Sequence, residues 1–539
     1  MPRARRVYLA VAIATFLTLG SALAKTIEFD AATLADINAA FDAGTLTSEA
    51  LTRMCLARIA AFDHKGPALH AVIALNPKAI EQARALDAER KAKGRRSPLH
   101  GIPVVLKDNY DTFDMPTTGG SILLEGSIPS KDAFVVKKLR DAGAIILAKV
   151  NMSEFASGGT YSSLGGQTLN PHDLSRGPSG SSGGTGVAIA AAYAPLGMGT
   201  DTGGSIRGPA TTNGIAALKP THGLLSRSGI IPLALSFDTG GPMARSVYDV
   251  AAALGIMTGI DAADSATAKS EGKFQTDYTA SLNVDALKGA RIGVARDFMG
   301  ADPDVDWVME AAFAAMRKAG ATLVDVRYPK WLLDVKSEFY QTIRYPEFAV
   351  QIADYLKGTG PKYPKSLAEM IERANQFTGT RDDGARPNPS RWTLFKRELE
   401  ATSTSDYRYK AIHDYGLPMV RAIVEGVFDA NQLDAIAYPT ASRRPSLITA
   451  TAGAGTTVAS ALSAGGLAAT DIANLTGFPD LIVPAGFTGD SLPVGLSFLG
   501  RAFTEARLLA IGYSFEQATR ARRRPVHTPA LSGETVSVP

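Results

Sequence analysis

Two turns rich in glycine and serine hold the residues of this sequence that are best suited to chemistry. The first covers residues 179–186 (SGSSGGTG) and the second covers residues 200–208 (TDTGGSIRG). A serine hydroxyl becomes a good nucleophile only when a base removes its proton. Glycine tolerates the backbone geometry in which successive N–H groups converge on one point, and such donors stabilise an oxyanion. Ser205, preceded by Gly203 and Gly204, is therefore a candidate nucleophile.

A flexible linker is the ordinary alternative for segments of this composition. The first turn, however, runs directly into the apolar segment 187–192 (VAIAAA), and the second glycine-rich turn follows it closely. This order favours a packed helix that begins at a glycine turn, which is a recurrent anion-binding arrangement. We therefore expect a site and not a linker.

The base that would activate the serine could be a lysine. Burial in an apolar pocket lowers the pKa of a lysine, because it disfavours the charged form. Lys107 follows the apolar run 102–106 (IPVVL) and could be such a lysine at the end of a strand. On the residues alone, a lysine exposed at a strand end is the more ordinary interpretation. His222, His413 and His527 occur in no distinctive pattern, so a surface or core histidine is the default for each.

Several other motifs can be set aside. Residues 180–184 (GSSGG) match the G-x-S-x-G pattern of α/β-hydrolases, but that motif needs a strand entering the turn, and 173–179 is polar and contains proline. The segment 184–186 lacks the third glycine of a dinucleotide fingerprint, and no phosphate-binding G-x-x-x-x-G-K-[ST] occurs. Cys55 is the only cysteine, which excludes an intramolecular disulfide and a cysteine metal cluster. No metal or organic cofactor is implied.

The segments around these turns alternate between the apolar patterns of helices and those of strands. The sequence predicts helices from Asp30 or Thr33 to about Gly44, from Thr47 to about Phe62, from an Asn76 N-cap with Pro77 in the first turn to about Gly94, and near 133–141. Short apolar runs predict buried strands at 71–75, 103–106, 144–148, 291–295, 322–326, 435–438, 481–483 and 494–499. This alternation argues for a layered α/β core.

The chain resembles the amidase signature family. That resemblance rests on the G-S-S-G-G turn at 180–184, followed 24 residues later by the G-G-S-I-R turn at 203–207. Further matching blocks occur in the same order at 101–108 (GIPVVLKD), 149–154 (KVNMSE), 218–221 (LKPT), 474–479 (NLTGFP) and 492–496 (LPVGL). The similarity extends from about residue 30 to residue 530, and 330–430 is its most divergent part.

The resemblance implies a role for each residue of the two turns. Ser205 would be the nucleophile, and Ser181, preceded by a cis peptide bond, would relay its proton to Lys107. Backbone N–H groups of Thr202, Gly203, Gly204 and Ser205 would form the oxyanion hole. Supporting roles fall to the neighbours of these residues, which are Ser182, Thr200, Asp201 and Arg207.

The family's fold is an α/β fold with a large mixed central β-sheet flanked by helices on both faces. Its members hydrolyse amides, carbamates and related substrates, and the layout is most similar to that of bacterial peptide amidases. Peptide C-terminal amides or small acyl or aryl amides are therefore the expected substrates. A carbamate or ester hydrolase, a non-catalytic binding protein and a partner-dependent transamidase subunit remain alternatives. Variable residues expected to contact substrate are Phe155, Ala156, Ser157, Tyr345 and Phe348.

The first 24 residues have the composition of a secretory signal peptide. Arg3, Arg5 and Arg6 precede an apolar stretch, and Ala22 to Ala24 supply the small residues of a cleavage site after Ala24. We expect an exported protein, periplasmic or secreted, with one domain over residues 25–539. Within it, 330–430 is expected to be a mostly helical insertion near the substrate site, and an ordinary helical layer is the alternative. For residues 1–24, an uncleaved membrane anchor is the alternative. Removing residues 1–24 lowers the formal charge from +4 to +1, and a nucleic-acid partner has little support.

Overall fold

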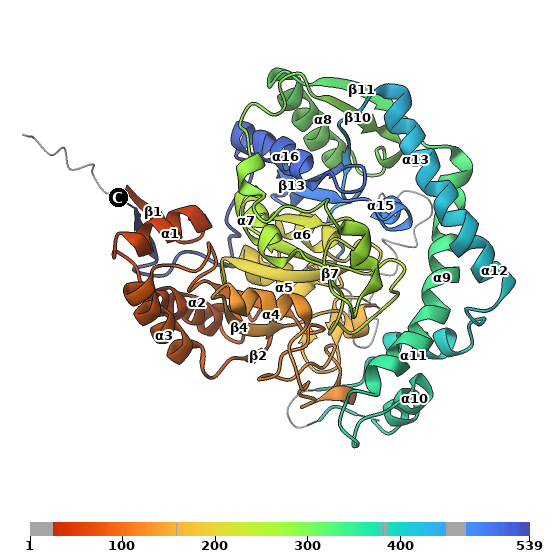
Figure 1. Cartoon of the computed structure of the whole chain (residues 1–539), viewed down its shortest axis with the longest axis horizontal. Coiled ribbons are helices and arrows are strands. Elements are labelled where there is room, and N and C mark those ends of the chain that lie inside the picture. Colours follow the sequence, from red (N-terminus) through yellow and green to blue (C-terminus); the bar gives the residue numbers. More distant parts are fainter. Residues whose placement is uncertain (1–24, 158, 378, 382–384, 449–469, 539) are drawn as a thin grey trace, which may run out of the picture.

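A mixed sheet of eleven strands forms the centre of the molecule in the computed structural model (Figure 1). The structure describes residues 25–157, 159–377, 379–381, 385–448 and 470–538, so the predicted signal peptide lies outside the described residues. The strand order in the large sheet is β11-β10-β12-β14-β13-β8-β9-β7-β3-β4-β2. Parallel pairs join β3 to both β4 and β7, and β10 to both β11 and β12. The predicted α/β fold with a large mixed sheet is confirmed.

The bounds of the strands are as follows. The large sheet contains β2 (Val72–Leu75), β3 (Pro103–Lys107), β4 (Ile145–Val150), β7 (Leu196–Asp201), β8 (Ala216–Lys219), β9 (Thr239–Ala244), β10 (Arg291–Ala295), β11 (Thr322–Val326), β12 (Ala435–Pro439), β13 (Asp480–Phe487) and β14 (Pro493–Leu499). Two small antiparallel sheets pair β1 (Lys25–Glu28) with β15 (Thr535–Val538), and β5 (Tyr161–Ser162) with β6 (Gly166–Gln167).

The α-helices within the described residues surround this sheet. They are α1 (Leu34–Asp42), α2 (Ser48–Phe62), α3 (Ala79–Lys93), α4 (Phe134–Asp141), α5 (Gly183–Ala190), α6 (Arg207–Asn213), α7 (Val247–Met257), α8 (Pro303–Lys318), α9 (Lys330–Leu356), α10 (Leu367–Asn375), α11 (Pro389–Leu399), α12 (Tyr407–Lys410), α13 (Leu417–Asn431), α15 (Thr470–Thr476) and α16 (Glu505–Thr519). None of the helices in the described ranges is long and apolar enough to cross a bilayer.

Two helix starts predicted from capping residues are confirmed, whereas the predicted Asn76 cap is wrong, because α3 begins at Ala79 after Lys78 and has no side-chain cap. Thr33 caps α1 by accepting a hydrogen bond from the N–H of Asp36, and Thr47 caps α2 in the same way. Both caps satisfy backbone donors that would otherwise have no partner at a helix start. The apolar faces of these two helices, including Cys55, are buried in the main core.

The segment 330–430 is built mainly from helices, with α9, α10, α11, α12 and α13 in sequence order. Figure 1 shows α9 and α13 running along one side of the molecule, away from α1 to α3. Helix α9 contacts α11 and α15, and its apolar side chains belong to two smaller core clusters. This layer therefore packs against the central sheet and its loops, because the two clusters also contain residues such as Ile436 of β12 and Met152.

Candidate active site

Lys107 is fully buried, so it is not the exposed strand-end lysine that is the more ordinary interpretation of the sequence. It is the last residue of β3, which lies between β4 and β7 in the large sheet. Its Nζ lies 2.7 Å from Oγ of Ser181, 2.7 Å from Oγ1 of Thr200 and 3.3 Å from the Thr200 carbonyl oxygen. Burial lowers the pKa of Lys107 to about 7, against the opposing effect of the Asp201 and Asp238 carboxylates. A substantial share of the lysine is therefore neutral near neutral pH.

Ser181 lies two residues before the first residue of α5, directly after a cis peptide bond between Gly180 and Ser181. The Ser181 carbonyl accepts a hydrogen bond from the N–H of Ser153 at 3.0 Å. Ser182, the next residue, donates its N–H to the carbonyl of Ser205 at 3.1 Å, and its hydroxyl lies 3.1 Å from the Thr200 carbonyl. The two turns are therefore fixed side by side through Ser182.

Ser205 lies in the tight turn between β7 and α6 and is partly exposed, whereas Lys107 and Ser181 are buried. The Asp201 carboxylate holds this turn by accepting hydrogen bonds from the N–H of Gly204 at 2.8 Å and of Ile206 at 2.9 Å. Gly204 has φ of +112°, a conformation that side-chain-bearing residues rarely adopt. The nucleophile candidate is thus the accessible member of the set.

The backbone N–H groups predicted for an oxyanion hole differ in whether they already donate a hydrogen bond. The N–H of Gly204 already donates to Asp201. For the N–H groups of Gly203 and Ser205, no acceptor occurs among the described residues. These two donors can therefore serve an oxyanion directly, while Gly204 would have to share its N–H with Asp201.

Arg207 neutralises the carboxylate that holds the turn. The guanidinium lies 3.2 Å from Asp201 and 3.1 Å from Asp480, and all three side chains are fully buried. It also donates to the Oδ1 of Asn474, whose Nδ2 donates to Asp201 at 2.9 Å. Burial alone would raise the pKa of Asp201, but Arg207 and these hydrogen bonds hold it below its usual range. Arg207 therefore supports the turn through the Asp201 carboxylate.

Arg207→Met should lower the free energy of unfolding by about 3–5 kcal/mol, because it leaves two buried carboxylates without their partner. Urea unfolding of both proteins measures this difference. Lys137→Met is a suitable control, since Lys137 forms an exposed ion pair with Asp141 and such pairs contribute little. An Arg207→Met protein as stable as the control would contradict a stabilising role for this network.

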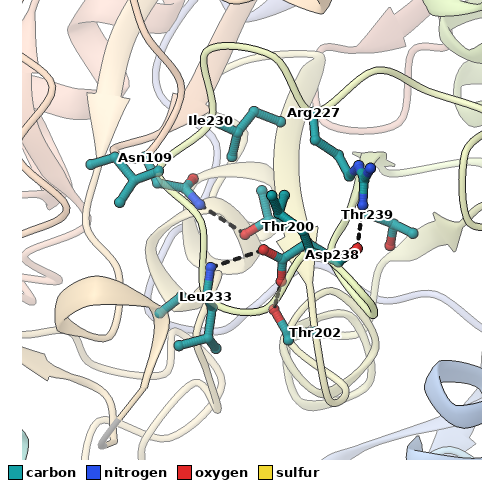
Figure 2. A pocket seen from close by; sticks show the side chains of 11 residues that line it. Asn109, Thr200, Thr202, Arg227, Ile230, Leu233, Asp238 and Thr239 are labelled. Carbon is teal, nitrogen blue, oxygen red and sulfur yellow. Dashed lines mark hydrogen bonds between the residues drawn. The ribbon is translucent and has the colours of Figure 1, made fainter. Parts of the chain in front are cut away.

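A small pocket opens beside Thr200 (Figure 2). Its polar wall contains Asp238, which accepts hydrogen bonds from the Thr202 hydroxyl and, at 2.8 Å, from the N–H of Leu233. Burial raises the pKa of Asp238 to about 6 despite these hydrogen bonds. The complete lining is Asn109, Ala156, Thr200, Thr202, Arg227, Ile230, Ile231, Leu233, Leu235, Asp238 and Thr239.

Of the five residues predicted to contact substrate, only Ala156 lines this pocket. Phe155 and Phe348 are instead buried in one of the two smaller core clusters. There the ring centroid of Phe395 lies 5.7 Å from that of Phe155 and 6.0 Å from that of Phe348. Tyr345 is half-buried beneath the Arg344 guanidinium. Ser157 is half-buried as well. Tyr345 and Phe348 therefore do not line this pocket, because Phe348 is buried in the core cluster that α9 shares with Phe155 and Phe395.

Three residues near the site were not predicted. Asn109 and Asp238 line the pocket, and Asn109 could have been noticed because it continues the block that contains Lys107. Tyr340 on α9 lies against the nucleophile turn: a Cβ added to Gly203 would come within 2.8 Å of its phenolic oxygen. The ring of Tyr340 stacks on Phe237 at 5.4 Å. No sequence pattern marks Tyr340, because it lies in the divergent helical segment.

No group of three or more His, Cys, Asp or Glu side chains that could hold a metal occurs in the described part of the chain. The groups that lie together at the candidate site are two serines, a buried lysine and backbone donors. These groups suit attack by a hydroxyl on a carbonyl carbon, with the lysine as proton acceptor.

Comparison with known proteins places the chain in one family. The family model named Amidase matches residues 50–509. The peptide amidase structure from Stenotrophomonas maltophilia is similar, with 38% identity, coverage of 93% of this chain and 99% of that chain, and a TM-score of 0.82. An amidase family protein from Bacillus anthracis has 33% identity, 92% coverage of both chains and a TM-score of 0.80.

Among curated relatives, a glutamyl-tRNA(Gln) amidotransferase subunit from Chloroflexus aggregans is 36% identical over 499 residues, which cover 90% of this chain and 96% of the relative. The chain belongs to the amidase signature family. It is a hydrolase of that family acting on carbon–nitrogen bonds, and its structure is like that of a peptide amidase.

Proposed function

We propose that this protein is an exported amidase that hydrolyses peptide C-terminal amides or small acyl or aryl amides through an acyl-enzyme on Ser205. The observation that carries the proposal is the 2.7 Å hydrogen bond between Ser181 and the buried amine of Lys107, next to the turn of Ser205. A base with a lowered pKa that is already hydrogen-bonded to a serine is what nucleophilic catalysis by serine requires.

The proposed reaction proceeds in two halves. Oγ of Ser205 attacks the amide carbon while its proton passes to Oγ of Ser181, and the Ser181 proton passes to neutral Lys107. The N–H groups of Gly203 and Ser205 stabilise the oxyanion. Collapse breaks the C–N bond, and the leaving nitrogen takes a proton from Ser181 as Lys107 returns its own. Water then attacks the acyl-enzyme by the same relay and releases the acid.

The substrate panel that tests the proposal contains peptide amides, aryl anilides, fatty amides, carbamates and matching esters. We expect purified protein to hydrolyse at least one amide class faster than the corresponding ester, without added partner or metal. Preference for carbamates or esters over every amide would replace the proposed substrate class while leaving the family unchanged.

A transamidase subunit is the second candidate, because relatives named as amidotransferase subunits are 36–38% identical to this chain. Such a protein would depend on partner proteins, so amide hydrolysis by the purified chain alone would argue against it. The similarity to a peptide amidase structure and the export signal expected in residues 1–24 favour a solitary hydrolase.

Export is part of the proposal and has its own test. N-terminal sequencing of the mature protein recovered from cells should begin at Lys25, the first residue after the small-residue site at Ala22 to Ala24. Protein that retains Met1 in the cytoplasmic fraction would contradict export.

A further inference from the structure

Asn109 is a buried residue close to the proposed base, with no role assigned so far. It follows Lys107 by two positions beyond the end of β3 and is only 2% exposed. Its carbonyl accepts a hydrogen bond from the N–H of Ile231 at 2.9 Å, which fixes its backbone to the loop that walls the pocket. Its side chain therefore has a defined direction.

The amide of Asn109 points at Thr200, as Figure 2 shows. Nδ2 of Asn109 donates to Oγ1 of Thr200 at 3.0 Å. The other side-chain atom, Oδ1, is buried and has no hydrogen-bond partner among the described residues. Burying an amide with one unsatisfied atom costs free energy. The hydrogen bond to Thr200 is therefore the interaction that we expect to explain why an asparagine occupies this position.

Thr200 in turn occupies two of the three hydrogen-bonding positions around the Lys107 amine. Its Oγ1 and its carbonyl oxygen lie 2.7 and 3.3 Å from Nζ, and Ser181 takes the third position at 2.7 Å. A neutral amine has two N–H donors and one lone pair, whereas an ammonium has three donors. If both oxygens of Thr200 accept N–H groups, the lone pair of the neutral amine faces Ser181.

The Thr200 hydroxyl can also donate a hydrogen bond instead of accepting one, because it has one donor and two acceptor positions. If it donated its own proton to Lys107, it would occupy the lone pair that Ser181 needs. The N–H of Asn109 fills one acceptor position of Oγ1 and so restricts how the hydroxyl can turn. The second acceptor position is then available to Lys107.

We infer that Asn109 is a positioning residue for the general base, holding Thr200 as a hydrogen-bond acceptor so that Lys107 exchanges its proton only with Ser181. This inference rests on the proposed Ser205–Ser181–Lys107 mechanism and extends it by one residue. Asn109 itself touches neither of the two serines in the hydrogen-bond network of the described residues.

The acidity of Lys107 offers a direct readout of this role. The charged groups that act on the lysine are Asp201 at the end of β7 and Asp238 immediately before β9. Asn109→Asp keeps the shape of the side chain, replaces its donor with an acceptor and adds a third negative charge beside Thr200. An opposite charge within about 4–6 Å raises the pKa of a lysine by about 1–3 units.

The experiment measures kcat and KM as functions of pH for the wild-type protein and for three variants: Asn109→Asp, Asn109→Ala and Asn283→Asp. The acidic limb of kcat/KM should move upward by about 1–3 units in Asn109→Asp, with activity recovered above the new limb. Asn109→Ala should lower kcat by about tenfold, the factor of one ordinary hydrogen bond, with KM nearly unchanged. Asn283→Asp, in a turn outside the pocket, should keep the wild-type profile.

A double-mutant cycle with Thr200→Val tests whether Asn109 acts through Thr200. In that background, Asn109→Ala should cause almost no further loss, because the hydroxyl it orients is gone. Independent, multiplying losses would overturn the inference, as would an unshifted acidic limb in folded Asn109→Asp. If Asn109→Asp fails to fold, the cycle built on alanine and valine decides. Wild-type activity in Ser205→Ala would instead refute the proposed mechanism itself, so the two failures are distinguishable.

Discussion

Ser205→Ala is expected to lower kcat for amide hydrolysis by at least about 10⁴-fold, because removing the nucleophile of a serine hydrolase leaves only binding and oxyanion stabilisation. The substitution removes one partly exposed hydroxyl and none of the hydrogen bonds that hold the turn, which come from backbone N–H groups and Asp201. The variant should therefore fold normally and still bind substrate.

The measurement is single-turnover and steady-state hydrolysis of the best substrate by both proteins at equal concentration. Thermal unfolding of both proteins provides the control for folding. Hydrolysis by Ser205→Ala at the wild-type rate would show that another group attacks the carbonyl, and would remove the relay through Ser181 from the account.

Lys107→Met should lower kcat by about 10²–10⁴-fold, the usual contribution of a positioned general base. Methionine has a similar length and suits the buried site, so the main chemical change is the loss of the amine that faces Ser181. Steady-state kinetics at a fixed neutral pH measures the loss.

Lys219→Met provides a matched control for that substitution. Lys219 is also fully buried, and burial likewise lowers its pKa to about 7. Its amine, however, donates to the carbonyls of Pro220 and Phe478 and has no serine partner among the described residues. Lys219→Met should reduce stability but retain most of kcat. Equal losses of kcat in both variants would mean that burial, and not the contact with Ser181, explains the importance of Lys107.

The pH dependence follows from the same lysine. The base must be neutral, and the pKa of Lys107 is lowered to about 7, so kcat/KM should rise with pH and level off above an acidic limb near pH 7. A pH profile of the wild-type protein from mildly acidic to alkaline buffers measures the limb. An optimum in acid that still requires Lys107 would contradict a neutral lysine as the base.

The parts of the fold that could be predicted from sequence are those with strong periodicity or capping residues. Helices α1 and α2 and the apolar strands β3, β4 and β10 belong to this group. The central strands β7, β8 and β9 were not predicted. Two of them read LGMGTD and TGGPMA, and glycine and proline are depleted in strands.

Close packing explains why glycine nonetheless occurs in these strands. A Cβ on Gly197 would lie 2.7 Å from a methyl group of Thr185 on α5, and one on Gly241 would overlap the carbonyl oxygen of Leu218 on β8. Only glycine leaves room for α5 and β8 at these points. The requirement comes from neighbours distant in sequence, so no local pattern could show it.

The site residues also fall into those that could be predicted from the sequence and those that could not. The two serine turns could be identified because their residue types and spacing are distinctive, whereas the burial of Lys107 depends on β3 lying between two other strands. The loop that supplies Ile230 to Leu235 has no periodicity, and it reaches the pocket through a bridge between Tyr110 and Ile230. Long-range pairing of this kind places Asn109 and Asp238 at the site without marking either residue in the sequence.

Trapping the acyl-enzyme tests the central claim most directly. The protein is mixed with a slowly hydrolysed activated substrate, quenched in acid during turnover, digested and mapped by mass spectrometry. The account predicts that the acyl group is found on Ser205 and that the Ser205→Ala protein carries none. An acyl group on another residue, or continued turnover with no covalent adduct at any time, would contradict a serine amidase mechanism for this site.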